Sequence, residues 1–270
     1  MRINLVDTTL RDGEQKPGIA LGINEKIEIS KLLDSIGIYQ IEAGTPAMEG
    51  DEKLSIERIA ELGLKSKISS WNRMSIKDIK HSIDCKVDII HISVPASDLQ
   101  LKYNLNKSKE WIISSMKKSI YYAISKGYEV TIGLEDASRA DLDFLIELCK
   151  NAYFEGVKRI RYADTVGILY PRKAFFDIKR IMEEVPIEIE MHTHNDFGMA
   201  EVNSLSAVKA GARYIDTTIG GIGERAGNCN FINFSSLINK RDLEMKKLKI
   251  KEEEIKNIIN YTILNKNTFK

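Results

Sequence analysis

Short apolar runs alternate with longer amphipathic stretches along most of this chain. The longer stretches repeat their apolar positions with the 3.6-residue period of helices, for example at residues 24–33, 141–153, 172–184 and 199–210. In the first of these, Asn24 is predicted to cap the helix and Gly37 to end it. The apolar runs have the length of buried strands, and lie at residues 3–6, 38–43, 67–70, 87–94, 129–134, 159–162, 187–191 and 214–217.

Eight predicted strands separated by predicted helices limit the folds that this chain can adopt. Eight such units in 270 residues match the size of a (β/α)8 TIM barrel, which needs roughly 250 residues. A doubly wound open sheet is the alternative, but no GxGxxG follows the first strand, which weakens a dinucleotide-binding interpretation. We therefore predict an α/β fold in which residues 1–240 form a (β/α)8 barrel.

The remaining residues, 241–270, are predicted to form a short C-terminal helical extension. The stretch is rich in Lys, Glu, Ile and Asn, and its apolar residues, among them Leu248, Ile255 and Ile259, have helical spacing. This helix could face a partner chain. The alternative is a helix folded back on the flank of the barrel.

Composition and charge narrow the range of partners and compartments. Lys and Arg number 40 against 39 Asp and Glu, and no basic stripe stands out, which argues against nucleic acid as a partner. No apolar run reaches membrane length, and the first residues become charged too early for a signal peptide. The three cysteines are odd in number and lack CxxC spacing, which fits the reducing cytoplasm.

The predicted strand at 187–191 leads into HTHND at residues 192–196. Side chains alternate between the two faces of a strand, so His192 and His194 are expected to point the same way. Two imidazoles on one face can grip a divalent metal ion. Two polar residues that simply leave a strand are the alternative, because short His patterns recur by accident.

Polar residues also follow the other predicted strands. In a barrel these junctions share one rim, where active sites lie. Buried charged groups there cost free energy unless they pair or hold a metal. The stretches are DTTLRDGEQ (7–15), EAGTP (42–46), EDASR (135–139), RYADT (161–165) and the glycine-rich GGIGERAGN (220–228). We therefore predict an active site at this rim.

Each of these motifs also has a structural interpretation when it is taken alone. The Arg11-Asp12 pair could be a salt bridge within a turn. The acidic pair Glu135-Asp136 could cap the next helix, and Asp164-Thr165 could begin a helix. The glycines could make only a tight loop. His91 lies in an apolar run, where a hydrogen-bonded core histidine is the favoured interpretation, and nothing in the sequence marks Cys229 as a nucleophile.

The stretches 7–15 and 192–196 together resemble the metal-dependent aldol and Claisen barrel family. That family includes isopropylmalate, homocitrate and citramalate synthases and hydroxymethylglutaryl-CoA lyase. The resemblance extends to about residue 240. The stretches LEDASRAD (134–141) and RYADTVG (161–167) most resemble the homocitrate synthases of the nitrogen-fixation type.

The resemblance implies roles for residues of this rim. It assigns a divalent metal, Mg²⁺, Mn²⁺ or Zn²⁺, to Asp12, His192, His194 and Asn228. It gives catalytic roles to Arg11, Glu135 and Thr165, with Arg11 beside the reacting carbonyl. It gives contacts with a 2-oxo acid to Gln15, Glu42, Thr165 and Arg161. The implied reaction joins acetyl-CoA to 2-oxoglutarate, and yields homocitrate and free CoA.

Two departures from the family pattern matter. Full-length synthases of the family carry a further helical region that supplies a His for proton transfer, whereas this sequence has no His after His194. We therefore expect this chain to be the amino-terminal subunit of a split synthase, completed by a second subunit. The lysine-pathway enzymes also bind the distal carboxylate through an Arg and a Ser of strand five, and VTIGLE (130–135) has neither. Pyruvate and 2-oxoisovalerate therefore stay open as substrates.

Three other functions compete with this one. A hydroxymethylglutaryl-CoA type of lyase would share the barrel and the metal, but would carry Gly-Gly-Cys-Pro where this chain has GGIG (220–223). A subunit could bind the 2-oxo acid without converting it. An unrelated metal-dependent aldolase would act on a hydroxy acid without CoA.

Overall fold

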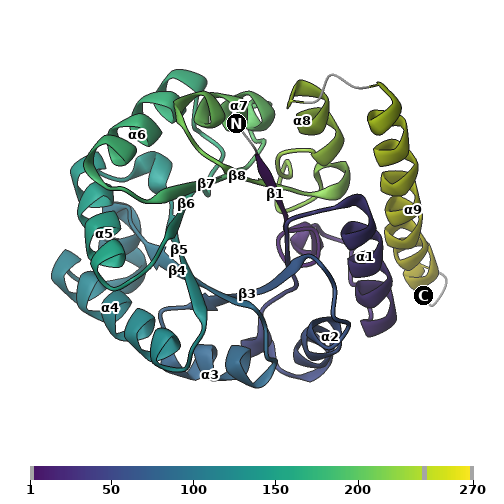
Figure 1. The fold of residues 1–270 in the computed structure, drawn as a ribbon, viewed down its shortest axis with the longest axis horizontal. Helices are drawn as coiled ribbons and strands as arrows, with labels where there is room; N and C mark the ends of the chain where they lie inside the picture. Colours follow the sequence, from purple (N-terminus) through teal and green to yellow (C-terminus); the bar gives the residue numbers. More distant parts are fainter. Residues whose placement is uncertain (1–2, 239–241, 268–270) are drawn as a thin grey trace.

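Eight parallel strands close into a barrel in the computed structural model, which describes residues 3–238 and 242–267. The strands follow one another in sequence order around the ring, and β1 closes it by pairing with β8 (Figure 1). They are β1 (Asn4–Asp7), β2 (Gln40–Glu42), β3 (Lys67–Arg73), β4 (Ile89–Pro95), β5 (Glu129–Glu135), β6 (Arg159–Asp164), β7 (Glu188–Thr193) and β8 (Tyr214–Thr217). The predicted TIM barrel is confirmed, and the open-sheet alternative is excluded.

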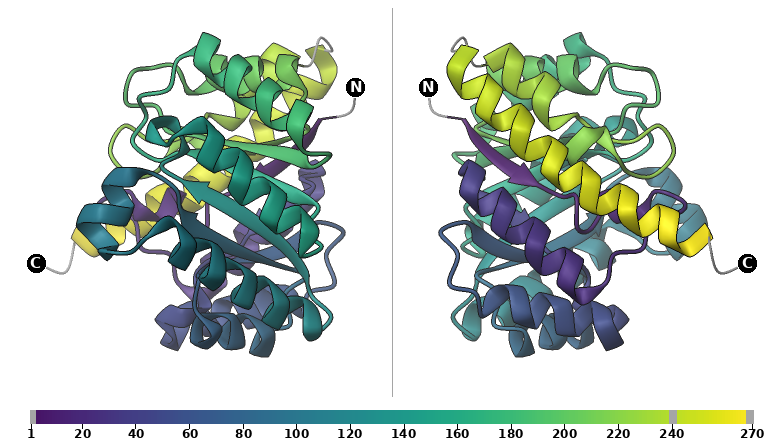
Figure 2. Two further views of the ribbon diagram at one scale, coloured as in Figure 1. Left: turned by 90° about the vertical axis from the view of Figure 1, so that its left-hand side faces the viewer. Right: turned by 90° about the vertical axis from the view of Figure 1, so that its right-hand side faces the viewer.

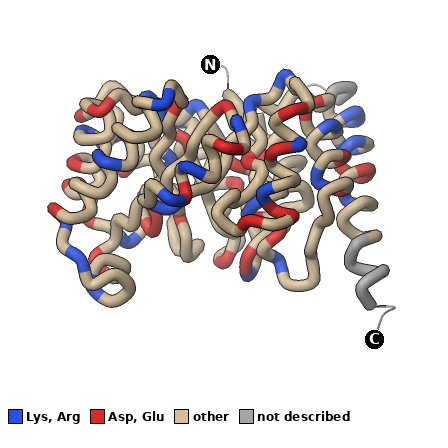
Figure 3. The backbone as a smooth tube through the Cα atoms, turned by 90° about the horizontal axis from the view of Figure 1, so that it is seen from below, with Lys and Arg blue, Asp and Glu red and all other residues tan. Residues whose placement is uncertain are grey.

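Helices surround the barrel on its outside (Figure 1). Those described are α1 (Ile23–Ile36), α2 (Gly50–Ala60), α3 (Ile76–Asp84), α4 (Lys109–Ser125), α5 (Leu142–Phe154), α6 (Pro171–Glu184), α7 (Ala200–Ala210), α8 (Phe231–Ile238) and α9 (Asp242–Asn267). None of the described helices has both the length and the apolar character needed to cross a bilayer. Lys and Arg, which nearly equal Asp and Glu in number, are interspersed with them along the backbone (Figure 3).

The predicted element boundaries agree closely with the observed ones. Strand β8 matches its predicted range, and β3 continues three residues further than predicted, to Arg73. The prediction for the start of α1 was wrong, because the helix is capped by Gly22 and Asn24 lies inside its first turn. Its predicted end was right, since Gly37 takes the left-handed conformation that glycine adopts readily (φ 84°).

Residues of each strand alternate between two environments. On β6, Tyr162 points outward and donates a hydrogen bond to Asp177 of α6, whereas Arg159 and Arg161 point into the barrel. The outward side chains form the apolar layer beneath the helices. Several inward side chains are charged and pair with one another, among them Arg159, Arg161, Glu42 and Glu190.

The C-terminal helix α9 lies against the flank of the barrel. It runs obliquely beside α1 and α8 (Figure 2) and buries Ile255 and Ile259. The folded-back alternative therefore describes this helix, although Ile250 on its outer surface is 61% exposed. Residue 241 and residues 268–270 of the predicted extension lie outside the described residues, as do residues 1–2 and 239–240 of the predicted barrel. A partner-facing role for the exposed surface of α9 stays a prediction.

Candidate active site

The polar ends of the strands meet around one cavity at the carboxyl end of the barrel. The cavity has a volume of about 180 Å³. The predicted residues that line it are Arg11, Asp12, Gln15, Glu135, Arg161, Thr165, His192 and His194. Two predicted residues lie just behind them, each hydrogen-bonded to a lining residue, Glu42 to Arg11 and Asn228 to Asp12. The structure thus brings together every residue that the sequence assigned to the site.

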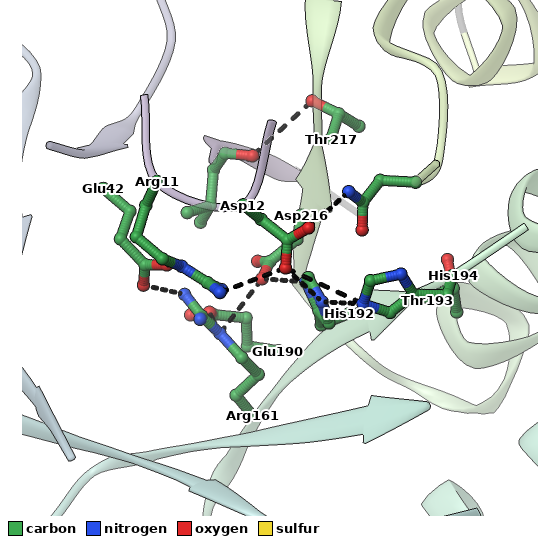
Figure 4. Close-up of polar contacts among 12 residues, drawn as sticks. Arg11, Asp12, Glu42, Arg161, Glu190, His192, Thr193, His194, Asp216 and Thr217 are labelled. Carbon is green, nitrogen blue, oxygen red and sulfur yellow. Dashed lines mark hydrogen bonds and ion pairs between the residues drawn. The ribbon is translucent and has the colours of Figure 1, made fainter. Parts of the chain in front are cut away.

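Three of the four side chains predicted as metal ligands, Asp12, His192 and His194, converge at the end of β7 (Figure 4). Asp12 Oδ2 lies 3.4 Å from His192 Nε2 and 3.7 Å from His194 Nε2, and the two ring nitrogens are 3.3 Å apart. All three ligand atoms fit within 4.8 Å of one another, and all three residues are buried. Imidazole nitrogen with carboxylate oxygen is a donor set that suits a divalent cation such as Zn²⁺ or Mn²⁺.

Asn228 supplies a further oxygen beside this group. Its Nδ2 donates to Asp12 Oδ1 at 2.8 Å and to the carbonyl of Ile222 at 3.1 Å, which fixes the orientation of the amide. Its Oδ1 is buried, and no described residue donates to it. A buried oxygen without a donor is costly unless something occupies it. The residues present therefore fit a cation held by two imidazoles, a carboxylate and an amide oxygen.

Charged neighbours set the protonation of these ligands. Burial opposes a charge on Asp12, but Arg11 and His192 outweigh it and hold the pKa of this carboxyl well below its usual range. Burial and the neighbouring His192 lower the pKa of His194 to about 4, so its ring is neutral and can donate a lone pair.

Asp216 of β8 orients His192. Its Oδ2 lies 3.0 Å from His192 Nδ1, so Nε2 is left facing Asp12 and His194. Burial opposes a charge on the ring, but the hydrogen bonds to Asp12 and Asp216 raise the pKa of His192 to about 9. A carboxylate behind a ligating histidine is a common arrangement in metal sites, where it fixes the tautomer and increases the basicity of the ring.

Arg11 is held on the cavity wall by two carboxylates. Its Nε donates to Glu42 Oε1 at 2.6 Å, and its Nη1 lies 3.0 Å from Asp12 Oδ2. The salt bridge between Arg11 and Asp12 therefore exists, but inside the cavity rather than in an isolated turn. Glu42 also accepts from Arg161 Nη2 at 2.7 Å, and these two arginines outweigh its burial and lower its pKa. Glu42 thus stays ionised and fixes the position of both guanidinium groups.

Arg161 contacts three carboxylates at the floor of the cavity. Besides Glu42, its Nε lies against Glu190 and 3.0 Å from Asp216 Oδ2. The side chain of Arg161 is only 2% exposed. Arg161 thus has a structural role at the floor of the cavity. Its contact with substrate stays a prediction.

The other predicted site residues, Gln15, Glu135 and Thr165, also line the cavity. Glu135 accepts from Ser93 Oγ at 3.0 Å and from Gln100 Nε2 at 2.5 Å. Thr165 Oγ1 accepts from the backbone N–H of Asp136 at 2.8 Å. Gln15 is exposed. Asp136 directly precedes a short 3-10 helix (Ala137–Arg139), but its side chain makes no capping hydrogen bond there. The residue that caps α5 is Asp141.

His91 lines the cavity although its sequence context indicates a core residue. Its Nδ1 is hydrogen-bonded to Thr131 Oγ1 at 2.8 Å, as a satisfied core histidine would be. Its other nitrogen faces Gly133, where a Cβ atom would lie only 2.5 Å from Nε2. Burial and the charge of Arg161 lower the pKa of His91 to about 3, so the ring is neutral. Gly133 thus makes room for a neutral hydrogen-bonding group in the cavity wall.

Sequence reasoning missed several residues of the cavity. Asp216 was missed because nothing in its local sequence links it to His192. Trp71 and Ser93 line the wall, and were missed because both lie inside strands rather than in the loops after them. Alternation within strands was the available signal, since residues two apart on one strand face the same side.

Comparisons with known proteins identify the family of the chain. The HMGL-like family model matches residues 2–260. The homocitrate synthase subunit alpha of Clostridium pasteurianum is 56% identical over 265 residues, which are 96% of this chain and 98% of the relative. A 2-isopropylmalate synthase of Caldanaerobacter subterraneus is 49% identical over 84% of this chain and 59% of its own length. Homocitrate synthase 1 of Nostoc is 42% identical over 84% of this chain and 60% of its own length.

Solved structures share the fold. The HMG-CoA lyase of Bacillus subtilis superposes with a TM-score of 0.83 over 96% of this chain and 94% of its own, at 17% identity. At that identity the likeness shows the barrel alone.

Proposed function

The chain belongs to the HMGL-like family, and we propose that within it the chain catalyses condensation of acetyl-CoA with 2-oxoglutarate. It is an acyltransferase of the homocitrate synthase kind. In the proposed reaction a methyl proton of acetyl-CoA is removed, the enolate carbon attacks the keto carbon, and water cleaves the thioester. The products are homocitrate and free CoA. The observation that carries the proposal is the 56% identity to the homocitrate synthase subunit alpha across nearly the whole of both chains.

The proposed metal ligands are Asp12, His192, His194 and Asn228. A divalent cation bound there supplies Lewis-acid polarisation of the keto oxygen. Asp12, His192 and His194 line the opening of the cavity together with Arg11 and Gln15, so a cation held there would be accessible from the cavity. A 2-oxo acid, with adjacent keto and carboxylate oxygens, has the chemistry to fill such an opening.

Arg11 is the residue proposed to stabilise the alkoxide that forms on the former keto oxygen. A positive group held in place before the reaction is most effective where negative charge appears. Arg11 meets that condition because Glu42 and Asp12 hold it on the cavity wall. Glu135 and Thr165 are proposed to position the reacting groups, and Gln15, Glu42, Thr165 and Arg161 to contact or support the 2-oxo acid.

The identity of the 2-oxo acid is the finer part of the proposal. Relatives named for homocitrate, isopropylmalate and citramalate synthesis all match this chain, at 42% to 56% identity. The preference for 2-oxoglutarate rests on the relative with 56% identity. Pyruvate and 2-oxoisovalerate are therefore the competitors to test.

A second subunit is also proposed to complete the active site. The support is the name of the relative with 56% identity, which is a subunit alpha. The 2-isopropylmalate synthase of Caldanaerobacter subterraneus and homocitrate synthase 1 of Nostoc are matched over only 59% and 60% of their length. The sequence has four histidines, and the two in the cavity wall besides His91 are assigned to the metal. His91 is hydrogen-bonded to Thr131, as a core histidine would be, so we propose that the histidine for proton transfer comes from another polypeptide. The alternative is that a different residue serves as the base.

Release of free thiol tests the reaction. Metal-free chain is supplied with Mn²⁺, acetyl-CoA and one 2-oxo acid at a time, with and without a co-expressed candidate second subunit. We expect kcat/KM to be highest with 2-oxoglutarate, thiol release to require the 2-oxo acid, and Asp12→Asn to abolish it. Robust turnover by the chain alone would contradict the second subunit. A higher kcat/KM with pyruvate or 2-oxoisovalerate would contradict the choice of substrate.

A further inference from the structure

A buried acidic residue of the C-terminal helix contacts the loop that follows β8. Glu252 of α9 is 3% exposed, and its Oε1 accepts a hydrogen bond from the backbone N–H of Gly220 at 3.1 Å. Its neighbour Glu253 is exposed, and the side chain of Glu254 is 43% exposed. Glu252 is therefore the member of this acidic run that points at the barrel.

Gly220, which Glu252 contacts, is followed by a residue that is hydrogen-bonded to Asn228. The next residue, Gly221, accepts a backbone hydrogen bond from Asn228 N at 3.0 Å through its carbonyl oxygen. The same loop also orients the amide of Asn228, since Nδ2 donates to the carbonyl of Ile222. Hydrogen bonds thus run from α9 through the backbone of residues 220–222 to the side chain whose buried oxygen has no donor among the described residues.

Lys256 strengthens the contact between helix and loop. Its Nζ lies 3.0 Å from Glu252 Oε2, which leaves Oε1 for Gly220. Its Cε would be 3.2 Å from a Cβ at Gly220, so its aliphatic part packs on the loop. The buried carboxylate therefore has a cation on one oxygen and the loop N–H on the other, which offsets the cost of its burial.

We infer that Glu252 is a positioning residue for the metal site, which acts by holding the loop that presents Asn228. This role rests on the metal site proposed above. It gives α9 a part in the active site through its inner face. A helix that only covered apolar surface would not need a buried carboxylate aimed at a loop N–H.

Metal binding by four purified, metal-free variants tests the inference, with Mn²⁺ alone as the probe in titration calorimetry. Glu252→Leu removes the acceptor, Glu252→Gln keeps an acceptor oxygen without the charge, and Glu252→Asp keeps the charge but withdraws the oxygen. Glu254→Leu is the matched control on the same helix. We expect Glu252→Leu to weaken Mn²⁺ binding by roughly tenfold, the low end for partners of metal ligands. Glu252→Gln and Glu254→Leu should stay within about twofold.

The inference would be overturned if Glu252→Leu melts at a lower temperature but binds Mn²⁺ as tightly as the unaltered chain. Glu252 would then have only a structural role. If Glu252→Leu does not fold, the comparison of Glu252→Asp with Glu252→Gln tests the inference instead. Glu252→Asp must bind Mn²⁺ more weakly than Glu252→Gln, and the reverse order would overturn the inference, because charge rather than the hydrogen bond would matter. Failure of the unaltered chain to bind Mn²⁺ would overturn the metal site itself.

Discussion

Asp7 is a single residue whose burial gives the fold a distinct response to pH. It ends β1, is fully buried, and accepts a hydrogen bond from Thr9 N at 2.9 Å with one oxygen. No described residue donates to its other oxygen. Burial, with a smaller contribution from Asp216, raises the pKa of Asp7 from 3.8 to about 7. The folded chain therefore holds a proton there that the unfolded chain releases above about pH 4.

The sign of the effect follows from proton linkage. Because the folded pKa of Asp7 is raised, its contribution to stability is present below pH 3.8 and is lost as the pH rises to about 7. Asp7→Asn stays neutral at every pH. The free energy of unfolding of Asp7→Asn, relative to that of the unaltered chain, should rise by up to about 1.4 kcal/mol per pH unit in this window.

Urea denaturation between pH 4.5 and 7.5, with a chelator present, measures this difference. Asp78 provides the control. Burial opposes its charge, but hydrogen bonds from Arg73 outweigh it and lower the pKa of Asp78 below 3.8. Asp78 is thus ionised in both states across the window, so the difference for Asp78→Asn should stay constant. A constant difference for Asp7→Asn as well would contradict the raised pKa.

The loop after β8 needs glycine at a position that packs against Asn228. Gly223 has a φ of 155°, and a Cβ there would lie 2.0 Å from Asn228 Nδ2 and 3.0 Å from Asp12 Oδ1. A side chain of any size would displace the amide of Asn228. Glycine at this position is therefore a requirement of the metal site, and tight turning explains only part of the glycine-rich motif.

Gly223→Ala should accordingly weaken Mn²⁺ binding by roughly tenfold or more, because it displaces Asn228. Gly198→Ala is the control, since Gly198 also has a positive φ (69°), but a Cβ there would meet no atom within 4 Å. It should carry backbone strain without loss of metal affinity. Titration calorimetry gives the affinities, and circular dichroism checks folding. Equal affinities of the two variants would show that Asn228 does not ligate the metal.

The whole molecule is a closed barrel with α9 packed against its flank. We expect the packing of α9 to contribute to the free energy of unfolding. Ile255 of α9 is fully buried, whereas Ile250, on the same helix, is 61% exposed. Ile255→Ala should lower the free energy of unfolding by about 2–5 kcal/mol. Ile250→Ala should change it by less than about 0.5 kcal/mol.

Denaturation curves of the two alanine variants test the packing of α9. Equal and small effects would mean that α9 does not rest on the barrel in solution. An effect at Ile250 that emerges only when a second subunit is present would identify the outer surface of α9 as its contact.

The sequence by itself determined the barrel and most of its site. Strand alternation placed His192 and His194 on one side, and the observed 3.3 Å between their Nε2 atoms agrees with it. The polar residues that follow each strand, such as Arg11 and Glu135, meet at one rim because all strands of the barrel are parallel. These features are local, or follow from the direction of the strands, so a linear pattern contains them.

Only the tertiary structure decided the partners that hold these residues in place. Arg161 meets Glu42 across 119 positions of sequence, Asp216 meets His192 across 24, and Glu252 meets Gly220 across 32. Each pairing depends on the register at which the strands close the ring, or on where α9 packs against it. No local pattern of apolar and polar residues encodes that geometry, because these hydrogen bonds join residues that lie far apart in the sequence.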